Sequence, residues 1–566
     1  MLNTEMGLAP RLRMRIILRT VLFAALLCLY GLCLSAQSGP RFEVVVPQSA
    51  HAQPITGRVF VILSRKESTS LLDRIGDWQQ ETPFFGKDVN ALTPGQAGVI
   101  DADTPGYPLA SLKDIPTGDY YVQALVNVYT EFHRSDGHTL WAHMDQWEGQ
   151  QFNKSPGNLY GEVQKVHLDP AKGYAIRLEA SKVIPPVEVP RDTQWVKHIK
   201  FESKLLSTFW GHPMYIGATV LLPKDYDRHP DVRYPVVYEQ GHFGLRPPLF
   251  MQMEPPEPGS KSEQFRYSAF HAWSGDNFPR MIGVTFQHPT PFFDDSYAVN
   301  SANDGPYGDA IMQELVPYLE QHFRIIREPW ARVLMGGSTG GWESLALQLY
   351  HPEFFGGTFT GFPDPIDFRH DQLVNIYEDA NAFEVPGYEW VQRERPMMRT
   401  AEGQVVETMR QMSQLEDVLG SHGRSGQQFE AWEAVYGPVG ADGYPKPLWD
   451  KRTGVIDRSV ADYMREHGYD LRYYLEKNWS TVGPQITDKV FIWVGDMDNF
   501  YLNLAVYDME DFLKSHPEAH ATFQYGRPEK GHGWFPWESG GEFIKLMADH
   551  IAAHAPAGAD VKSWHY

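Results

Sequence analysis

Ser338 stands in residues 332–349, a segment whose pattern suits a nucleophile. An apolar run at residues 333–335 is followed by Gly-Gly-Ser-Thr-Gly-Gly and then by a helical pattern. A strand, a sharp turn and a helix form a nucleophile elbow, in which the turn lifts a serine hydroxyl clear of a sheet. Side chains at Gly336 and Gly340 would collide as the helix turns back, which explains the glycines. The motif alone also fits an ordinary glycine-rich turn, so an acid and a base elsewhere in the chain are needed to identify Ser338 as a nucleophile.

Two later strand ends supply the acid and the base that a serine nucleophile needs. In an α/β-hydrolase the serine, the acid and the histidine follow in that order, each at the carboxyl end of a strand. A strand expected at residues 490–494 runs into Asp496 and Asp498, and one at 522–525 runs into a loop with His532. We predict that Asp498 orients His532 as the base for the serine, with Asp496 as the reserve acid.

An oxyanion formed at this serine would need preorganised backbone donors. The N–H of Thr339, directly after the serine, is one candidate. The loop after a strand at residues 234–238 offers the second at Phe243, with His242 as the alternate. His242 precedes the serine in the chain, so we interpret it as a residue that lines the substrate site. Trp534 is a second lining candidate, although an aromatic cluster next to a base also suits core packing.

The chain divides into two regions of different pattern. Residues 41–182 predict a small β-sandwich-like domain, and the proline-rich residues 183–198 predict a linker. Residues 199–555 alternate strands with helices, which predicts an α/β fold with a mostly parallel sheet, an α/β-hydrolase domain. Within it, residues 364–487 exceed one strand–helix unit and predict a cap-like insert. Strands are expected at 216–222, 234–238, 281–286, 333–335, 490–494 and 522–525, and helices at 310–323, 342–350 and 542–552.

Residues 1–36 have the pattern of a secretory signal peptide. Four arginines between residues 11 and 19 precede an apolar stretch at 21–34 that is too short to favour a membrane anchor. Both cysteines, Cys28 and Cys33, lie inside this segment, so we expect a mature chain without a disulfide or a thiolate nucleophile. The predicted location is extracytoplasmic, in the periplasm or the medium, without stable membrane insertion after cleavage.

Charge and ligand spacing exclude several classes of function. A net charge of −21 disfavours binding to nucleic acid or to an anionic membrane. No His-x-x-x-His spacing with a nearby glutamate supports a zinc site, and Asp294 and Asp295 are interpreted as turn residues. We therefore predict no metal and no cofactor. The sequence leaves the oligomeric state open.

Several motifs occur in a recognisable order along residues 200–552. They are residues 218–226 (ATVLLPKDY), 233–244 (RYPVVYEQGHFG), 307–323 (YGDAIMQELVPYLEQHF), the GGSTGG elbow with residues 351–355 (HPEFF) downstream, Gly495-x-x-Asp498 and Gly531-His532-x-Trp534. Outside the insert, this region resembles the esterase D and enterochelin-esterase-like branch of the α/β-hydrolases, the putative esterase family. Thr339 stands where that family commonly has methionine, and Gln240-Gly241-His242 replaces its usual His-Gly order.

The resemblance implies a secreted serine hydrolase that cleaves carboxylic esters through an acyl-enzyme. Its substrate would be a small-molecule or polysaccharide-linked ester, and feruloyl, acetyl, siderophore and small metabolite esters all remain open. An acyltransferase with a sugar acceptor would use the same acyl-enzyme. A serine peptidase of the prolyl-oligopeptidase type shares the triad, but the amino-terminal region is too short for its β-propeller. A binding protein on a hydrolase scaffold is the non-enzymatic alternative.

Overall fold

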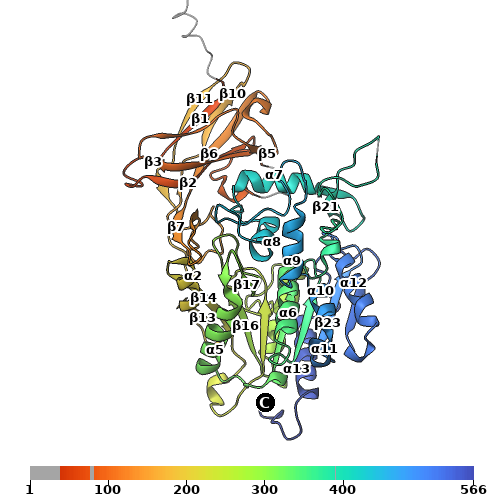
Figure 1. Cartoon of the computed structure of the whole chain (residues 1–566). Coiled ribbons are helices and arrows are strands. Elements are labelled where there is room, and N and C mark those ends of the chain that lie inside the picture. The colour runs from red at the N-terminus through yellow and green to blue at the C-terminus, as the bar shows by residue number, and fades with distance from the viewer. Residues whose placement is uncertain (1–38, 77–81, 389) are drawn as a thin grey trace, which may run out of the picture.

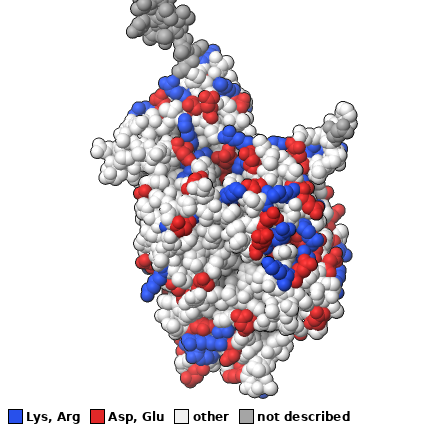
Figure 2. Space-filling view, viewed as in Figure 1, with Lys and Arg blue, Asp and Glu red and all other residues white. Residues whose placement is uncertain are grey.

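The computed structural model describes residues 39–76, 82–388 and 390–566, so the predicted signal peptide lies outside the described part. Figure 1 shows a β-rich amino-terminal region at one end of the molecule and a larger α/β region that ends at the carboxyl terminus. Across the described residues, no helix is both long and apolar enough to span a bilayer. Acidic and basic side chains are interleaved over the face drawn in Figure 2.

An eight-stranded sheet forms the centre of the α/β region. Its order is β13-β14-β16-β15-β19-β20-β23-β24. The strands are β13 (Val196–Ser203), β14 (Met214–Leu221), β15 (Val236–Gln240), β16 (Ile282–Gln287), β19 (Arg332–Gly337), β20 (Gly357–Gly361), β23 (Val490–Gly495) and β24 (Thr522–Gly526). The first two run antiparallel to their neighbours, and all pairs from β16 to β24 are parallel. This order is that of an α/β-hydrolase, which confirms the predicted fold class.

The parallel strands explain where the predicted site residues meet. Because parallel strands end at one edge of a sheet, the segments after β15, β19, β20, β23 and β24 converge there. The six predicted strands of this sheet agree with the observed ones to within two residues at each end. The helices around it are α2 (Lys204–Trp210), α3 (Lys261–Trp273), α4 (Tyr307–Ala310), the π-helical turn η4 (Ile311–Leu315), α5 (Val316–His322), α6 (Thr339–Tyr350), α12 (Asn503–Lys514) and α13 (Gly540–Ala553).

Two sheets make up the amino-terminal region. One has the order β11-β1-β4, and the other has the order β12-β9-β6-β2-β3-β5 with β10 paired to β6. The strands are β1 (Arg41–Val45), β2 (Ile55–Ser64), β3 (Phe84–Leu92), β4 (Ala97–Ile100), β5 (Gly106–Tyr107), β6 (Gly118–Val128), β9 (Leu159–Tyr160), β10 (Gln164–Leu168), β11 (Ala175–Glu179) and β12 (Lys182–Val183). Alternate residues of β1 and β6, such as Phe42 and Val122, share a buried apolar cluster of this region.

The boundaries between the regions are less sharp than the sequence pattern indicates. The hairpin β7 (Thr130–His133) and β8 (Thr139–Ala142) belongs by sequence to the amino-terminal region, but its Phe132 and Leu140 join the core of the α/β region. Strand β13 begins at Val196, inside the range predicted as a linker. At the other end Trp564 is fully buried, because the residues after α13 fold back onto the domain.

The long segment between β20 and β23 forms an insert of helices over the strand ends. Figure 1 shows α7 and α8 between the sheet and the amino-terminal region. Its elements are β21 (Pro396–Arg399), β22 (Val405–Thr408), α7 (Met409–Leu419), α8 (Gln428–Tyr436), α9 (Arg458–Glu466), α10 (Leu471–Lys477) and α11 (Trp479–Val482). Side chains of α7 and α8 enter the same apolar cluster as α6, so the insert is packed onto the helix that follows Ser338.

Arg58 of β2 joins the amino-terminal region to the insert. Its buried guanidinium donates hydrogen bonds to the carbonyl oxygens of Asp417 and Val418 at the end of α7, at 2.9 to 3.2 Å. It also pairs with Asp88 of β3 at 2.6 Å, and Asp88 in turn pairs with Arg424 of the insert at 2.8 Å. The two regions are therefore tied by charge-assisted hydrogen bonds from the buried side chains of Arg58 and Arg424.

We predict that Arg58→Met lowers the free energy of unfolding by about 3 kcal/mol, because buried carbonyl oxygens and Asp88 lose their donor. The measurement is unfolding in guanidinium chloride. The matched control is Arg41→Met, since Arg41 forms a partly exposed pair with Glu43 and should change the stability by no more than about 0.5 kcal/mol. Equal losses in the two variants would contradict a special role for Arg58.

Candidate active site

Ser338 occupies a tight turn between β19 and α6. Its φ of 58° and ψ of −123° are unfavourable for a residue with a side chain and fit a strained elbow. A Cβ atom on Gly336 would lie 2.1 Å from the carbonyl oxygen of Gly340. A Cβ atom on Gly340 would lie 2.0 Å from the carbonyl oxygen of Gln240, at the end of β15. The steric reason expected for both glycines is confirmed, and the elbow touches the loop after β15.

Asp498 and His532 meet at the neighbouring strand ends. His532 Nδ1 lies 2.8 Å from Asp498 Oδ2, and Asp498 is fully buried after β23. The other oxygen of Asp498 accepts the backbone N–H of Phe500 at 2.9 Å. The backbone N–H of His532 donates to Asn499 Oδ1 at 2.7 Å, while Phe362 and Phe500 contact the imidazole edge-on. The hydrogen bond to Asp498 and the two aromatic contacts thus hold the imidazole ring, with Nδ1 turned toward the acid.

The hydroxyl of Ser338 faces an acid that the sequence analysis did not single out. Ser338 Oγ donates to Asp364 Oδ1 at 3.3 Å, and no hydrogen bond within 3.5 Å joins Ser338 to His532 among the described residues. Asp364 follows β20 and also accepts from Thr339 Oγ1 at 3.0 Å and from Tyr297 at 2.7 Å. Burial raises the pKa of Asp364 above its usual value, and these hydrogen bonds oppose the rise.

Asp364 could have been found from its place after a parallel strand. It stands at the first residue of the predicted insert, and the strand before it, β20, is not among the predicted strands. A proton on His532 would act on Asp364, since His532 lowers the pKa of that carboxyl. Asp364 therefore interacts with both the serine and the base. The hydroxyl of Ser338 must turn away from Asp364 to bond to the imidazole of His532.

The loop after β15 brings His242 and Phe243 to the elbow. His242 Nε2 lies 3.5 Å from Thr339 Oγ1, and its Nδ1 lies 3.0 Å from Asp294 Oδ1. The ring of Phe243 packs edge-on against Trp147 at 5.2 Å. This contact fixes the backbone near Phe243, and the oxyanion roles of the Phe243 and Thr339 amides stay predictions.

The two lining candidates take different positions. His242 is one of the residues that line the cavity at Ser338. Trp534 is not among the cavity-lining residues of the described chain, and its ring lies against Gly526 at the end of β24. It belongs to the aromatic packing under α13 with Trp537 and Phe543.

A cavity of about 460 Å³ opens at Ser338 and is built from three parts of the chain. The amino-terminal region gives Ile75, Gly76 and residues 149–153. The strand-end loops give His242, Phe293, Asp294, Ser338, Asp364, Phe500 and Leu502. The insert gives Gln372, Met397, Met412, Leu419, residues 425–429 and Trp432. Most of these side chains are apolar, aromatic or amides, and within the described residues no lysine or arginine lines the cavity. Such a lining suits an uncharged ligand with apolar and hydrogen-bonding groups.

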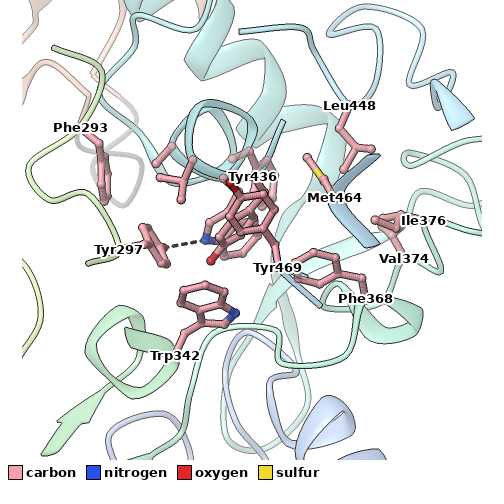
Figure 3. Close-up of a cluster of buried hydrophobic side chains, with 14 of the residues drawn as sticks. Phe293, Tyr297, Trp342, Phe368, Val374, Ile376, Tyr436, Leu448, Met464 and Tyr469 are labelled. Carbon is pink, nitrogen blue, oxygen red and sulfur yellow. Dashed lines mark hydrogen bonds between the residues drawn. The ribbon is translucent and has the colours of Figure 1, made fainter. Parts of the chain in front are cut away.

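An aromatic cluster anchors the insert beside the nucleophile helix. Figure 3 shows Tyr297 facing Trp342 of α6 and Tyr436 of α8. Their ring centroids lie 4.9 to 5.6 Å apart. The hydroxyl of Tyr297 accepts hydrogen bonds from Trp432 at 2.6 Å and from Gln428, and it donates to Asp364. The insert thereby fixes the polar groups that face Ser338.

The strand order and the serine elbow define an α/β-hydrolase with the residues of a serine hydrolase at its strand ends. Residues 278–435 match the family model described as Putative esterase. The matched residues include the Ser338 elbow and lie within the region whose motifs resemble that family. No curated protein matches the chain.

The solved structures that match the chain have low sequence identity and TM-scores below 0.5. A ferulic acid esterase is 14% identical with a TM-score of 0.36, over 63% of this chain and 98% of that one. S-formylglutathione hydrolase (FrmB) from Staphylococcus aureus is 14% identical with a TM-score of 0.33, over 63% and 98%. S-formylglutathione hydrolase from Agrobacterium tumefaciens is 13% identical with a TM-score of 0.30, over 65% and 97%.

We predict that Asp498→Asn lowers kcat on the order of 10⁴-fold, because the amide no longer holds His532 in the tautomer that accepts a proton at Nε2. The control is Asp496→Asn. The carboxylate of Asp496 is engaged by Tyr507 at 2.9 Å and by Arg527 at 2.5 Å, so this variant should keep activity within a few-fold. Hydrolysis of a p-nitrophenyl ester measures both, and the reverse ranking would make Asp496 the acid.

Proposed function

We propose that this protein is a serine esterase that hydrolyses carboxylic esters through an acyl-enzyme on Ser338. The observation that carries the proposal is the hydrogen bond between Asp498 and His532 at the same strand edge as the Ser338 elbow. The cavity that opens at Ser338 gives an ester room to bind. The family match over residues 278–435 supports the same class of reaction.

In the proposed mechanism the hydroxyl of Ser338 turns from Asp364 toward His532 when an ester binds. His532 Nε2 takes the proton while Ser338 Oγ forms a bond to the carbonyl carbon, and the carbonyl oxygen becomes an oxyanion. The amides of Thr339 and Phe243 donate to this oxyanion. Collapse of the intermediate expels the alcohol, which takes the proton from His532. Water repeats the sequence and releases the acid.

The buried Asp498 contributes without changing its own charge. It lies on the Nδ1 side of His532, so it keeps the proton at Nδ1 and leaves Nε2 free to act as a base. When His532 becomes an imidazolium, the adjacent carboxylate stabilises the new charge. Because Asp498 is fully buried, water screens this interaction little.

The cavity favours uncharged esters as the substrate class. Asp294 and Asp364 both line it, and a carboxylate on the substrate would meet them without a lysine or arginine among the described lining residues. Aromatic rings such as Phe152, Phe429 and Trp432 give apolar faces, and the glutamines beside them can bond to hydroxyl or carbonyl groups.

Export is part of the proposal, since residues 1–36 have the composition of a signal peptide. We predict that the native host releases a chain that begins near residue 37, with both cysteines removed. Intact mass and amino-terminal sequencing of the protein purified from its host test this. A full-length chain retained in the cytoplasm would contradict it.

We predict that Ser338→Ala lowers hydrolysis of p-nitrophenyl acetate by about 1,000-fold or more, because no other group replaces the nucleophile. Ser515→Ala is the matched control. The hydroxyl of Ser515 bonds to Phe512 and His516 near the end of α12, and the variant should match the unmodified enzyme. A fluorophosphonate should label the unmodified enzyme and leave Ser338→Ala unlabelled. Undiminished hydrolysis by Ser338→Ala would overturn the proposed function.

A further inference from the structure

His242 has charged or polar partners on both ring nitrogens. Nδ1 lies 3.0 Å from Asp294 Oδ1 and 3.4 Å from Asp295 Oδ2, both on the loop after β16. Nε2 lies 3.5 Å from Thr339 Oγ1, directly after the nucleophile. The side chain is half-exposed and lines the cavity. Two acids therefore hold the Nδ1 side of His242, and the Nε2 side faces Thr339.

The hydrogen-bond partners of His242 favour hydrogen on both of its ring nitrogens. Asp294 is an acceptor, so Nδ1 donates to it. Thr339 Oγ1 gives its own proton to Asp364 Oδ2 at 3.0 Å, so it presents a lone pair toward Nε2. This arrangement suits an imidazolium, in which both nitrogens carry hydrogen and Nε2 points its hydrogen toward Thr339 Oγ1. At 3.5 Å the bond from Nε2 is long, and this donor is available to a better acceptor.

The charges around His242 agree with this assignment. Burial alone would lower the pKa of His242, but Asp294 and Asp295 outweigh it and raise that pKa well above its usual value. The other titratable groups nearby are Asp364, Glu343 of α6 and His288 at the end of β16. Burial raises the pKa of Glu343 well above its usual value and lowers the pKa of His288 to about 4, so burial favours the neutral form of both groups.

We propose that His242 is a charged side-chain donor to the carbonyl oxygen of the bound ester, beside the backbone N–H of Thr339. Asp294 and Asp295 are the positioning residues that hold its ring. The inference rests on the proposed esterase function and adds a group to it. Its geometric basis is twofold. The strand end that leads to His242 touches the elbow at Gln240 and Gly340, and Nε2 lies 3.5 Å from the hydroxyl oxygen of Thr339, the residue that carries the proposed amide donor.

In the chemical step His242 transfers no proton. As Ser338 Oγ bonds to the carbonyl carbon, the π electrons move onto the carbonyl oxygen, and Nε2–H exchanges its long bond with Thr339 for a bond to this oxyanion. The proton of Ser338 goes to His532, as before. Since the oxyanion exists in the transition state more than in the bound ester, the new bond should raise kcat more than it lowers KM.

A binding site for a substrate carboxylate is the competing role for a cation in this position. The surroundings disfavour it, because the three carboxyl groups of Asp294, Asp295 and Asp364 lie around this one imidazole ring and its hydrogen-bond partner Thr339. A permanent anion would be repelled, whereas an oxyanion forms only at the point to which Nε2 is directed. We therefore expect neutral esters to be preferred to esters that carry a carboxylate.

The experiment compares the unmodified enzyme with His242→Gln, Asp294→Asn and Ser338→Ala. Initial rates with p-nitrophenyl acetate and with the p-nitrophenyl monoester of succinic acid are recorded from pH 6 to pH 10. His422→Gln is the matched control, because His422 forms an exposed pair with Asp442 at 2.9 Å away from the cavity lining. Thermal unfolding of each variant shows that it is folded.

We expect His242→Gln to lower kcat for the neutral ester about 100-fold with little change in KM. In the unmodified enzyme the folded-state pKa of His242 is raised, so its contribution is present at neutral pH and lost as the pH rises through that pKa. The alkaline decline should therefore disappear in His242→Gln and move to lower pH in Asp294→Asn. A merely structural histidine would not produce this pair of changes.

Three results would overturn the inference. In the first, His242→Gln keeps the kcat and the alkaline decline of the unmodified enzyme while Ser338→Ala is inactive, so the esterase function stands without His242. In the second, His242→Gln raises KM for the succinyl monoester alone, so His242 binds a substrate carboxylate. In the third, Ser338→Ala retains full activity, so the proposed function fails and the inference fails with it.

Discussion

The close contact between the elbow and the loop after β15 is the constraint on which the site depends. Gly340 lies so near the carbonyl oxygen of Gln240 that no side chain fits between them. This contact permits the strained backbone of Ser338 and fixes where α6 begins. It also brings His242 close to the residue after the serine, since His242 follows Gln240 by only two residues and its Nε2 lies 3.5 Å from Thr339 Oγ1. The contact between Gly340 and Gln240 thus joins the two segments that carry the nucleophile and the proposed oxyanion donors.

The sheet edge sets the chemistry, while two added regions set the space around it. The insert brings Gln428 and Trp432 to Tyr297, which holds Asp364 opposite Ser338. The amino-terminal region closes the other wall of the cavity with residues 149–153 and is tied to the insert by Arg58. The amino-terminal region therefore helps to shape the substrate site, and its removal would open the cavity.

Much of the fold could be predicted from the sequence because its signals are local. Short apolar runs gave the parallel strands, and the Gly-x-Ser-x-Gly spacing gave the elbow, since both patterns have direct steric causes. The pairing of Asp498 with His532 followed from chain order, because parallel strands deliver their ends to one edge. The long helix expected at residues 310–323 is interrupted by the π-helical turn η4, which no residue pattern announced.

What could not be predicted depends on contacts between distant segments. Asp364 is defined by hydroxyl donors from β16–α4 and α6, and its partners lie 25 to 67 residues away. The charge on His242 depends on Asp294 and Asp295, which looked like turn residues in the sequence. The region boundaries differ from the predicted ones for the same reason. The β7–β8 hairpin belongs to the amino-terminal region by sequence, but it packs in the core of the α/β region.

Peptide mapping of the trapped acyl-enzyme tests the central claim most directly. The enzyme is mixed with excess p-nitrophenyl acetate, quenched in acid within the burst of nitrophenol, and digested with trypsin. The account predicts an acetyl group on the peptide of residues 333–369, located at Ser338 by fragmentation. An acetyl group on another residue, or a burst without any modified peptide, would contradict an acyl-enzyme at this serine.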